Sequence, residues 1–230
     1  MGYLKKVQYR SLTGLILGMV LVMSVCAARW SGNDEKTEAA SGKAGCTKEI
    51  ALTFDDGPHP KWTPILLEGL KKRGIRATFF VIGESAEQYP QLIQQMEEDG
   101  HQIGNHTYSH IQLTRCPLPH ALSEIQKTQE VIRLITRKTP KFIRPPFGSW
   151  NEALAEQTSL TAVLWDVDPY DWKYQDCRQI VDSIKAQTED QSIILLHDVY
   201  ETSVQAALEI ADYYQKQGYR FCRVDEIFIE

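Results

Sequence analysis

Basic residues are not in excess in this chain, and cysteine is scarce. The 25 lysines and arginines are outnumbered by 30 aspartates and glutamates, which leaves a formal net charge of −5. Proteins that bind nucleic acid through its phosphates carry clustered basic side chains, so a nucleic-acid partner is not expected. The five cysteines form no CxxC pair and no zinc-finger spacing, which argues against a structural zinc site.

The longest apolar run lies at the N-terminus. Lys5, Lys6 and Arg10 precede an uncharged stretch, 11–28. A positive start followed by an apolar run is typical of a secretory signal, and this run is also nearly long enough to span a bilayer. We therefore expect residues 1–30 to be a signal peptide or membrane anchor. The protein is then extracytoplasmic, either secreted or attached to the membrane at the cell surface.

The next segment, 31–47, is small, polar and charged, with the sequence SGNDEKTEAASGKAGCT. Such a composition buries too little apolar surface to fold, and it predicts a flexible linker. The remaining residues, 48–230, suit a single domain, because 43% of the whole sequence is apolar. We expect this domain to be catalytic and monomeric.

Outside the cytoplasm disulfides can form, so the cysteines have two interpretations. Cys26 lies in the N-terminal segment, where its context fits a lipid-modified signal poorly. The other four allow the pairs Cys46–Cys222 and Cys116–Cys177. The alternative is that these thiols are buried and unpaired. Spacing does not decide between the two.

Apolar periodicity predicts alternating strands and helices along the domain. Strands are expected at 49–54, 77–82, a short stretch through 103, 141–143, 160–165, 192–196 and 219–224. Helices are expected from an N-cap at Thr63 to Gly74, and at 90–99, 118–136, 152–157, 179–187 and 203–217. This order indicates an α/β fold of parallel βαβ units, either a barrel or an open doubly wound sheet. An eight-unit barrel takes about 250 residues, which favours fewer units here.

Two motifs contain groups that bind metals. Asp55 and Asp56 end the first strand, where adjacent carboxylates point in different directions, so one can bind a metal while the other acts as a base. His106 and His110 are four residues apart, which would place both imidazoles on one side of a helical turn. Each motif also has an ordinary interpretation, as turn chemistry for Asp-Gly-Pro and as helix capping for histidine.

Three further segments carry polar side chains after predicted strands. Arg144 opens RPPFG and could orient a carboxylate bidentately. The segment 166–172, DVDPYDW, places three acids among aromatics, and a carboxylate there could fix the tautomer of a histidine and raise its pKa. His197 ends an apolar strand, a suitable place for acid–base chemistry. Taken singly, these are equally a surface arginine, an ordinary loop and a structural histidine.

Together and in this order, the segments TFDDGP, HTYSH, RPPFG, DPYDW and LLH resemble the motifs of the polysaccharide deacetylase family, the chitooligosaccharide-deacetylase homology domain of carbohydrate esterase family four. The resemblance covers 48–229. It implies an irregular (β/α)7 barrel, similar to a TIM barrel, which agrees with the length argument. It also implies a hydrolase that removes N-acetyl groups from an amino-sugar polymer, either peptidoglycan or a chitin-like glycan, and releases acetate.

The resemblance also implies a metal centre with a base beside it. Asp56, His106 and His110 match the ligands of one divalent metal ion, which we expect to be zinc. Asp55 matches the general base, and Arg144 matches the residue that orients this base.

The remaining matched residues lie around the leaving group and the acetyl group. His197 matches the general acid, and Asp171 the carboxylate paired with it. Trp172 and Leu195 match residues that line the pocket for the acetyl methyl group. The backbone amide of Phe147 matches the oxyanion donor. The family usually has tyrosine at this position, but the main chain does the work.

Two other functions stay open. The same site could act as an O-acetyl esterase on xylan or another glycan, because an alkoxide leaves more easily than an amine. A non-catalytic carbohydrate-binding wall protein is the second alternative, although such a protein would be expected to have lost a site residue, and none is missing. His59, His101 and His120 match no catalytic position, and we interpret them as rim, structural and surface residues respectively.

Overall fold

The computed structural model of the protein describes residues 48–227. The predicted signal or anchor at 1–30, the predicted linker at 31–47, and with them Cys26 and Cys46, lie outside the described residues. Within 48–227, no helix has the length and apolar character needed to cross a membrane.

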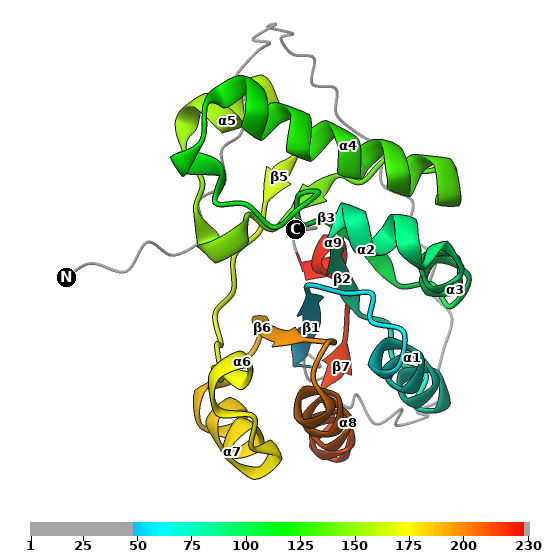
Figure 1. Cartoon of the computed structure of the whole chain (residues 1–230). Coiled ribbons are helices and arrows are strands. Elements are labelled where there is room, and N and C mark those ends of the chain that lie inside the picture. Colours follow the sequence, from blue (N-terminus) through cyan, green and yellow to red (C-terminus); the bar gives the residue numbers. More distant parts are fainter. Residues whose placement is uncertain (1–47, 228–230) are drawn as a thin grey trace, which may run out of the picture. The chain divides into compact units, whose positions relative to one another are not determined.

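Strands and helices alternate along the described residues, as the periodicity predicts (Figure 1). The strands are β1 (Glu49–Asp55), β2 (Thr78–Val81), β3 (Gln102–Asn105), β4 (Phe142–Ile143), β5 (Thr161–Ala162), β6 (Ser192–His197) and β7 (Arg220–Phe221). The α-helices are α1 (Trp62–Lys72), α2 (Gly83–Gln88), α3 (Pro90–Glu98), α4 (Leu118–Thr136), α5 (Glu152–Gln157), α6 (Asp171–Tyr174), α7 (Cys177–Gln187), α8 (Glu201–Lys216) and α9 (Val224–Ile227). Short 3-10 helices occur at η1 (Leu113–Arg115) and η2 (Pro146–Gly148).

The strands form a closed, irregular barrel. All strand pairs are parallel, in the order β5-β4-β3-β2-β1-β6, and β7 pairs with the first residues of β1. After β5 the chain returns to β6, where Val167 forms a parallel bridge with Ile194 and accepts a hydrogen bond from the backbone N–H of Leu195 at 2.9 Å. This bridge closes the row of strands, so the prediction of a seven-unit barrel is confirmed and an open sheet is excluded.

Alternation along β1 explains how the barrel packs. Ile50, Leu52 and Phe54 are buried and belong to the large apolar cluster between the strands and the outer helices. Ala51 belongs to a second, smaller cluster that includes residues from four other segments. Because successive side chains of a strand point to opposite faces, Thr53 and Asp55 lie on the same face as Ala51. The barrel interior is therefore apolar at one end of β1 and polar at its carboxyl end.

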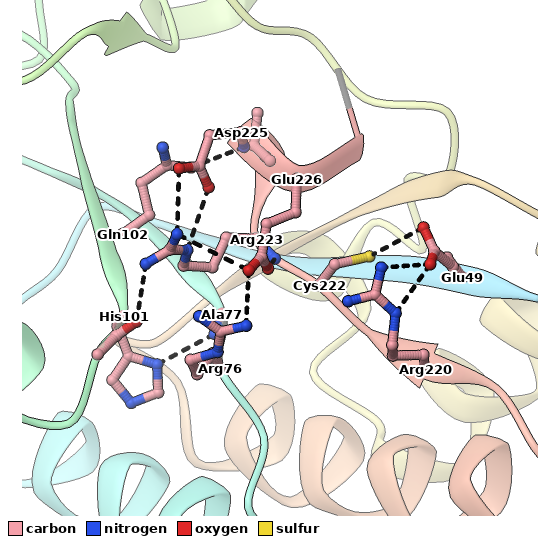
Figure 2. Close-up of polar contacts among 12 residues, drawn as sticks. Glu49, Arg76, Ala77, His101, Gln102, Arg220, Cys222, Arg223, Asp225 and Glu226 are labelled. Atoms are coloured by element: carbon pink, nitrogen blue, oxygen red, sulfur yellow. Dashed lines mark hydrogen bonds and ion pairs between the residues drawn. The ribbon is translucent and has the colours of Figure 1, made fainter. Parts of the chain in front are cut away.

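Ion pairs tie the last segment of the chain to the N-terminal ends of the strands (Figure 2). Arg76 pairs with Glu226 of α9 at 2.6 Å, and Arg220 of β7 pairs with Glu49 of β1. The backbone N–H of Val224 donates to Thr78 of β2 at 3.0 Å. The described C-terminal residues thus close one end of the barrel, and the other end remains for the polar motifs.

One local expectation was wrong, and helix α2 was missed. Thr63 is not the N-cap of α1, since the cap is Lys61 and Thr63 lies inside the helix. The Thr63 hydroxyl instead donates to Asp198 and accepts from the backbone N–H of His59. Helix α2 was not predicted, because its six residues contain a single buried apolar side chain, Ala86, and so show no apolar periodicity.

The predicted Cys116–Cys177 disulfide is also wrong, and Cys222 is a free thiol. Cys116 packs against the cluster around α4 and α5, whereas Cys177 packs against the large cluster that includes α7 and α8, so the two side chains belong to different cores. The Cys222 sulfur lies near the backbone carbonyl of Ile50. For these three cysteines the alternative of unpaired thiols is therefore confirmed.

His101 predicts an acid-sensitive stability. This side chain is buried, and its Nδ1 accepts a hydrogen bond from the backbone N–H of Ala77 at 3.0 Å, so the ring is neutral with its proton on Nε2 (Figure 2). Burial lowers the pKa of His101 to about 4. The unfolded chain takes up this proton near pH 6.5, so stability is complete above that pH and falls between pH 6.5 and pH 4.

We expect the free energy of unfolding to fall by about 2 kcal/mol more between pH 7 and pH 5 in the wild type than in His101→Asn, whose side-chain oxygen can still accept from Ala77. Urea unfolding at both pH values measures the difference. His120→Asn, on the exposed start of α4, is the control and should behave as the wild type. An identical pH dependence in the wild type and His101→Asn would contradict the assignment.

Candidate active site

The polar motifs meet at the carboxyl ends of the strands. Asp55 ends β1, His197 ends β6, His106 follows β3 and Arg144 follows β4. In the register of β1 and β6, Asp55 lies directly beside His197. This end is where ligands bind in parallel barrels, because the strands deliver side chains from many segments to one place.

The structure brings together three possible metal ligands, Asp56, His106 and His110. Oδ1 of Asp56 lies 3.3 Å from Nε2 of His106 and 3.4 Å from Nε2 of His110. One potential ligand atom from each residue lies within 4.8 Å of the others. Two imidazoles and one carboxylate, with room for further ligands, are a common donor set for catalytic zinc and related divalent ions.

Two observations test whether these residues fit a metal ion. Oδ1 of Asp56 is buried and has no hydrogen-bond partner within residues 48–227, although its position between two imidazoles is polar. Nδ1 of His106 lies 2.6 Å from the backbone carbonyl of Arg144, to which it donates, and this leaves the Nε2 lone pair facing Asp56. A ring oriented through its far nitrogen is typical of metal-bound histidine. The residues fit a divalent cation.

Electrostatics in the cluster also suit metal binding. Burial lowers the pKa of His110, which favours the neutral imidazole that binds metals. Burial by itself would raise the pKa of Asp56, but its interaction with the nearby imidazole of His106, and with those of His197 and His110, lowers it. The carboxylate is therefore ionised at neutral pH.

The histidines do not lie on a helical turn, so that expectation was wrong. Residues 106–112 follow β3 as a loop, in which Thr107 and His110 have φ values of 64° and 55°. The reversals of the backbone, and not a helical repeat, bring the rings of His106 and His110 to 5.0 Å between centroids. The four-residue spacing thus predicted correctly that His106 and His110 lie together, but the helical turn on which the prediction rested is not there.

Arg144 is fully buried and organises the interior beside the cluster. Its Nη1 donates to Oδ1 of Asp55 at 2.9 Å and to the hydroxyl of Thr53 at 2.6 Å. Its Nε and Nη2 donate to the backbone carbonyls of Val163 and Leu164. The second oxygen of Asp55 lies 3.9 Å from Nε2 of His106, so this carboxylate stands at the edge of the candidate metal site.

His197 is paired with a buried carboxylate. Its Nδ1 lies 2.8 Å from Oδ1 of Asp171, and its backbone N–H donates to the other oxygen of the same carboxylate at 2.8 Å. Burial alone would lower the pKa of His197. The hydrogen bond to Asp171 and the charges of Asp171, Asp55 and Asp56 outweigh burial and raise the pKa to about 9. Nε2 of His197 lies 4.0 Å from Oδ2 of Asp56.

The predicted substrate-contacting residues lie at different depths. Leu195 is buried in β6, two residues before His197. Phe147 is 67% exposed, has a φ of 61° and holds its ring 5.0 Å from that of His110. Trp172 is about half exposed on α6, next to Asp171. No direct contact joins Trp172 to the cluster among the described residues, so its role stays a prediction.

Sequence reasoning did not assign several residues at this end. Thr53 binds Arg144, and the fully buried Asp198, next to His197, accepts a hydrogen bond from Thr63. Burial raises the pKa of Asp198 to about 7. The ring of Tyr200 lies 6.3 Å from that of His197. The signal for Asp198 was present, since it follows His197 in LLHD, but nothing in the chain indicated its partner.

The other histidines lie away from the cluster. His59 is half-buried, and its Nδ1 accepts from the backbone at the start of α1. His101 is buried at the other end of β3, and His120 is exposed on α4.

A parallel barrel with a candidate histidine–carboxylate metal site at the carboxyl ends of its strands defines the class of this protein. The polysaccharide deacetylase family model matches residues 42–163. The chain belongs to this family, and the predicted resemblance to polysaccharide deacetylases is confirmed.

Relatives of known name agree with this assignment. The chain is 43% identical over 180 residues to the peptidoglycan-N-acetylmuramic acid deacetylase PdaC of Bacillus subtilis, and 38% identical over 188 residues to the peptidoglycan-N-acetylglucosamine deacetylase PgdA of Listeria monocytogenes. These matches cover 78% and 82% of this chain, but only 38% and 40% of the two relatives.

Solved structures confirm the fold. The structure of PdaC from Bacillus subtilis superposes with a TM-score of 0.78 at 43% identity, over 79% of this chain and 90% of that one. A family 4 acetyl xylan esterase from Clostridium thermocellum, solved in complex with a cobalt ion, superposes with a TM-score of 0.74 at 32% identity, over 79% and 90% of the two chains.

Arg144→Met tests the buried ion pair. The substitution leaves Asp55 charged, buried and without its cation, so we expect a loss of about 3–5 kcal/mol in the free energy of unfolding. Urea denaturation of the metal-free protein measures this loss. Arg133→Met, which breaks an exposed pair with Glu130 on α4, is the matched control and should leave the unfolding free energy unchanged. Equal stability of both variants would contradict the role given to Arg144.

Proposed function

We propose that residues 48–230 form a metal-dependent N-deacetylase that removes acetyl groups from N-acetylglucosamine or N-acetylmuramic acid residues of peptidoglycan. The supporting observation is the arrangement around Asp56: a three-residue candidate metal site, with the buried carboxylate of Asp55 and the Asp171–His197 pair both close to it. The names of the relatives PdaC and PgdA point to the same polymer.

Asp56, His106 and His110 would hold one divalent ion, which we expect to be zinc. Such an ion, when bound, polarises a carbonyl group and makes water a stronger acid. The protein's own part begins with Asp55. Its Oδ1 is held by Arg144 at 2.9 Å, which fixes the orientation of the carboxylate, and its Oδ2 is left to accept a proton from the attacking water.

His197 supplies the second proton transfer. With a pKa raised to about 9 the imidazole is protonated at neutral pH, and the Asp171 carboxylate holds its Nδ1, so Nε2 carries a proton toward the site. Protonation by Nε2 allows the sugar nitrogen to leave as an amine. The Phe147 backbone N–H is the proposed donor to the oxygen of the carbonyl that is attacked, in agreement with the reversed backbone at this residue.

The proposed place of action is outside the cytoplasm. Peptidoglycan lies there, and residues 1–30 have the composition of a signal peptide or membrane anchor. Residues 31–47 would then serve as a linker that lets the monomeric domain reach a polymer. Measuring the mass of the mature protein from cells distinguishes a cleaved signal from an anchor.

Asp55→Asn tests the base. The amide keeps the shape of the side chain and cannot accept the proton of the attacking water, so we expect kcat/KM for acetate release to fall at least 100-fold. Acetate release from peptidoglycan fragments and N-acetylated chitooligomers measures the effect, with zinc content checked in parallel. Turnover equal to the wild type would refute the role of Asp55. No release from any of these glycans by the zinc-loaded wild type would refute the proposed activity.

Removal of the metal should abolish the reaction. We expect dialysis against a chelator to eliminate acetate release and one equivalent of zinc to restore it, whereas His106→Ala should not be restored. The apolar core clusters contain none of the three candidate ligands, so the circular dichroism of the metal-free protein should stay that of the folded domain. Full activity after complete metal removal would contradict the assignment.

An O-acetyl esterase is the second candidate, favoured by the similarity to the acetyl xylan esterase of Clostridium thermocellum. The same base and acid would serve, because an ester also needs an activated water and a protonated leaving group. Parallel assays on acetylated xylan and N-acetylated chitooligomers separate the two activities.

A further inference from the structure

The two histidines of the candidate metal site are held in different ways. His106 is nearly fully buried, and its ring is aimed through the hydrogen bond between Nδ1 and the Arg144 carbonyl. The His110 side chain is 33% exposed, and within the described residues its ring nitrogens make no hydrogen bond. Its ring is tilted against the rings of His106 and Phe147, with centroids 5.0 Å apart in both pairs. The direction of the His110 ring therefore depends on its backbone.

That backbone is strained. Thr107 and His110 both have positive φ, a conformation that costs energy for residues with a Cβ and persists only where the surroundings impose it. One side of the loop is held by α2, whose first two backbone N–H groups, from Gly83 and Glu84, donate to the carbonyls of Thr107 and Tyr108 at 2.9 Å and 3.0 Å. Gly83 allows this approach, since a Cβ there would lie 2.7 Å from the Tyr108 ring.

The other side of the loop is held by a buried carboxylate on α4. Oε2 of Glu124 accepts two hydrogen bonds from Ser109, one from the backbone N–H and one from the hydroxyl, both at 2.8 Å. Glu124 is only 5% exposed, and no lysine or arginine pairs with it in the part of the chain that the structure describes. A buried carboxylate without a cation is costly, so its two bonds to the residue next to His110 call for an explanation.

We propose that Glu124 is a positioning residue for the metal centre: by fixing Ser109, its carboxylate holds the backbone that aims His110 at Asp56. The inference rests on the metal site of the proposed function and goes beyond it, because it makes α4, outside the barrel, a determinant of metal affinity. Glu124 touches neither the ligand atoms nor the reacting groups. Glu124 acts on His110 only through its hydrogen bonds to the backbone N–H and the hydroxyl of Ser109.

Zinc affinity of purified variants tests this proposal, measured by competition with a chromophoric chelator. Glu124→Ala removes the acceptor, and we expect zinc binding to weaken about 10–100-fold, as is usual for groups that orient a ligand. Glu124→Gln keeps an oxygen that can accept both bonds and should stay within about threefold of the wild type. Glu130→Ala, an exposed position on the same helix, is the matched control and should bind zinc as the wild type does.

Thermal unfolding of the metal-free variants separates positioning from general stability. A folded Glu124→Ala with wild-type zinc affinity would overturn the proposal, and so would a Glu124→Gln that binds zinc as weakly as Glu124→Ala, because charge and not hydrogen bonding would then be responsible. If Glu124→Ala does not fold, Ser109→Ala decides, since it removes one of the two bonds and should weaken zinc binding about 3–10-fold. Unchanged affinity in Ser109→Ala would overturn the proposal.

Zinc affinity can be measured whether or not the protein catalyses deacetylation. Zinc binding that weakens in Glu124→Ala, in a protein that releases no acetate, would support this inference while refuting the proposed function.

Discussion

The geometry of the candidate site depends on one residue, Arg144, through two different groups. Its guanidinium holds the Asp55 carboxylate, and its backbone carbonyl accepts from Nδ1 of His106. The candidate base and one candidate metal ligand are therefore set by the same residue, directly after β4. An ion pair with no exposed side chain is expensive to form, because both charges lose their water. Here Thr53 and two backbone carbonyls accept from three of the other four N–H groups, so the pair serves as a fixed reference for the site.

Around this pair, the two ends of the barrel differ in chemistry. At one end, ion pairs such as Arg76–Glu226 join the last helix to the strands and contribute to closure. At the other end, carboxylates and imidazoles lie close together with few cations, an arrangement that favours binding a positive ion and disfavours the empty state. Stability and chemistry thus occupy opposite ends of the same strands, as in other parallel barrels.

Much of this was predictable from the sequence, and the exceptions have physical causes. Helix α4 begins and ends where its apolar spacing predicts, because 19 residues give the periodicity room to repeat. Helix α2 is too short and too polar to show it. The pairing of His106 with His110 followed from their motif, yet the loop that achieves it uses backbone reversals that depend on contacts with α2 and α4. Partners distant in sequence, such as Thr63 and Asp198, leave no local pattern.

The closure of the barrel between β5 and β6 has a consequence of its own. β1 and β6 are in register over six residues, whereas the return to β6 is made by a single bridge, Val167–Ile194, with a few neighbouring hydrogen bonds. We call this junction, the Val167–Ile194 bridge, the seam of the barrel. Opening the seam would break fewer main-chain hydrogen bonds than separating two long strands. Helix α6, which bears Asp171 and Trp172, follows shortly after the seam. Because Asp171 holds Nδ1 of His197, opening the seam would shift the partner of the candidate general acid while the longer strand pairs stay in place.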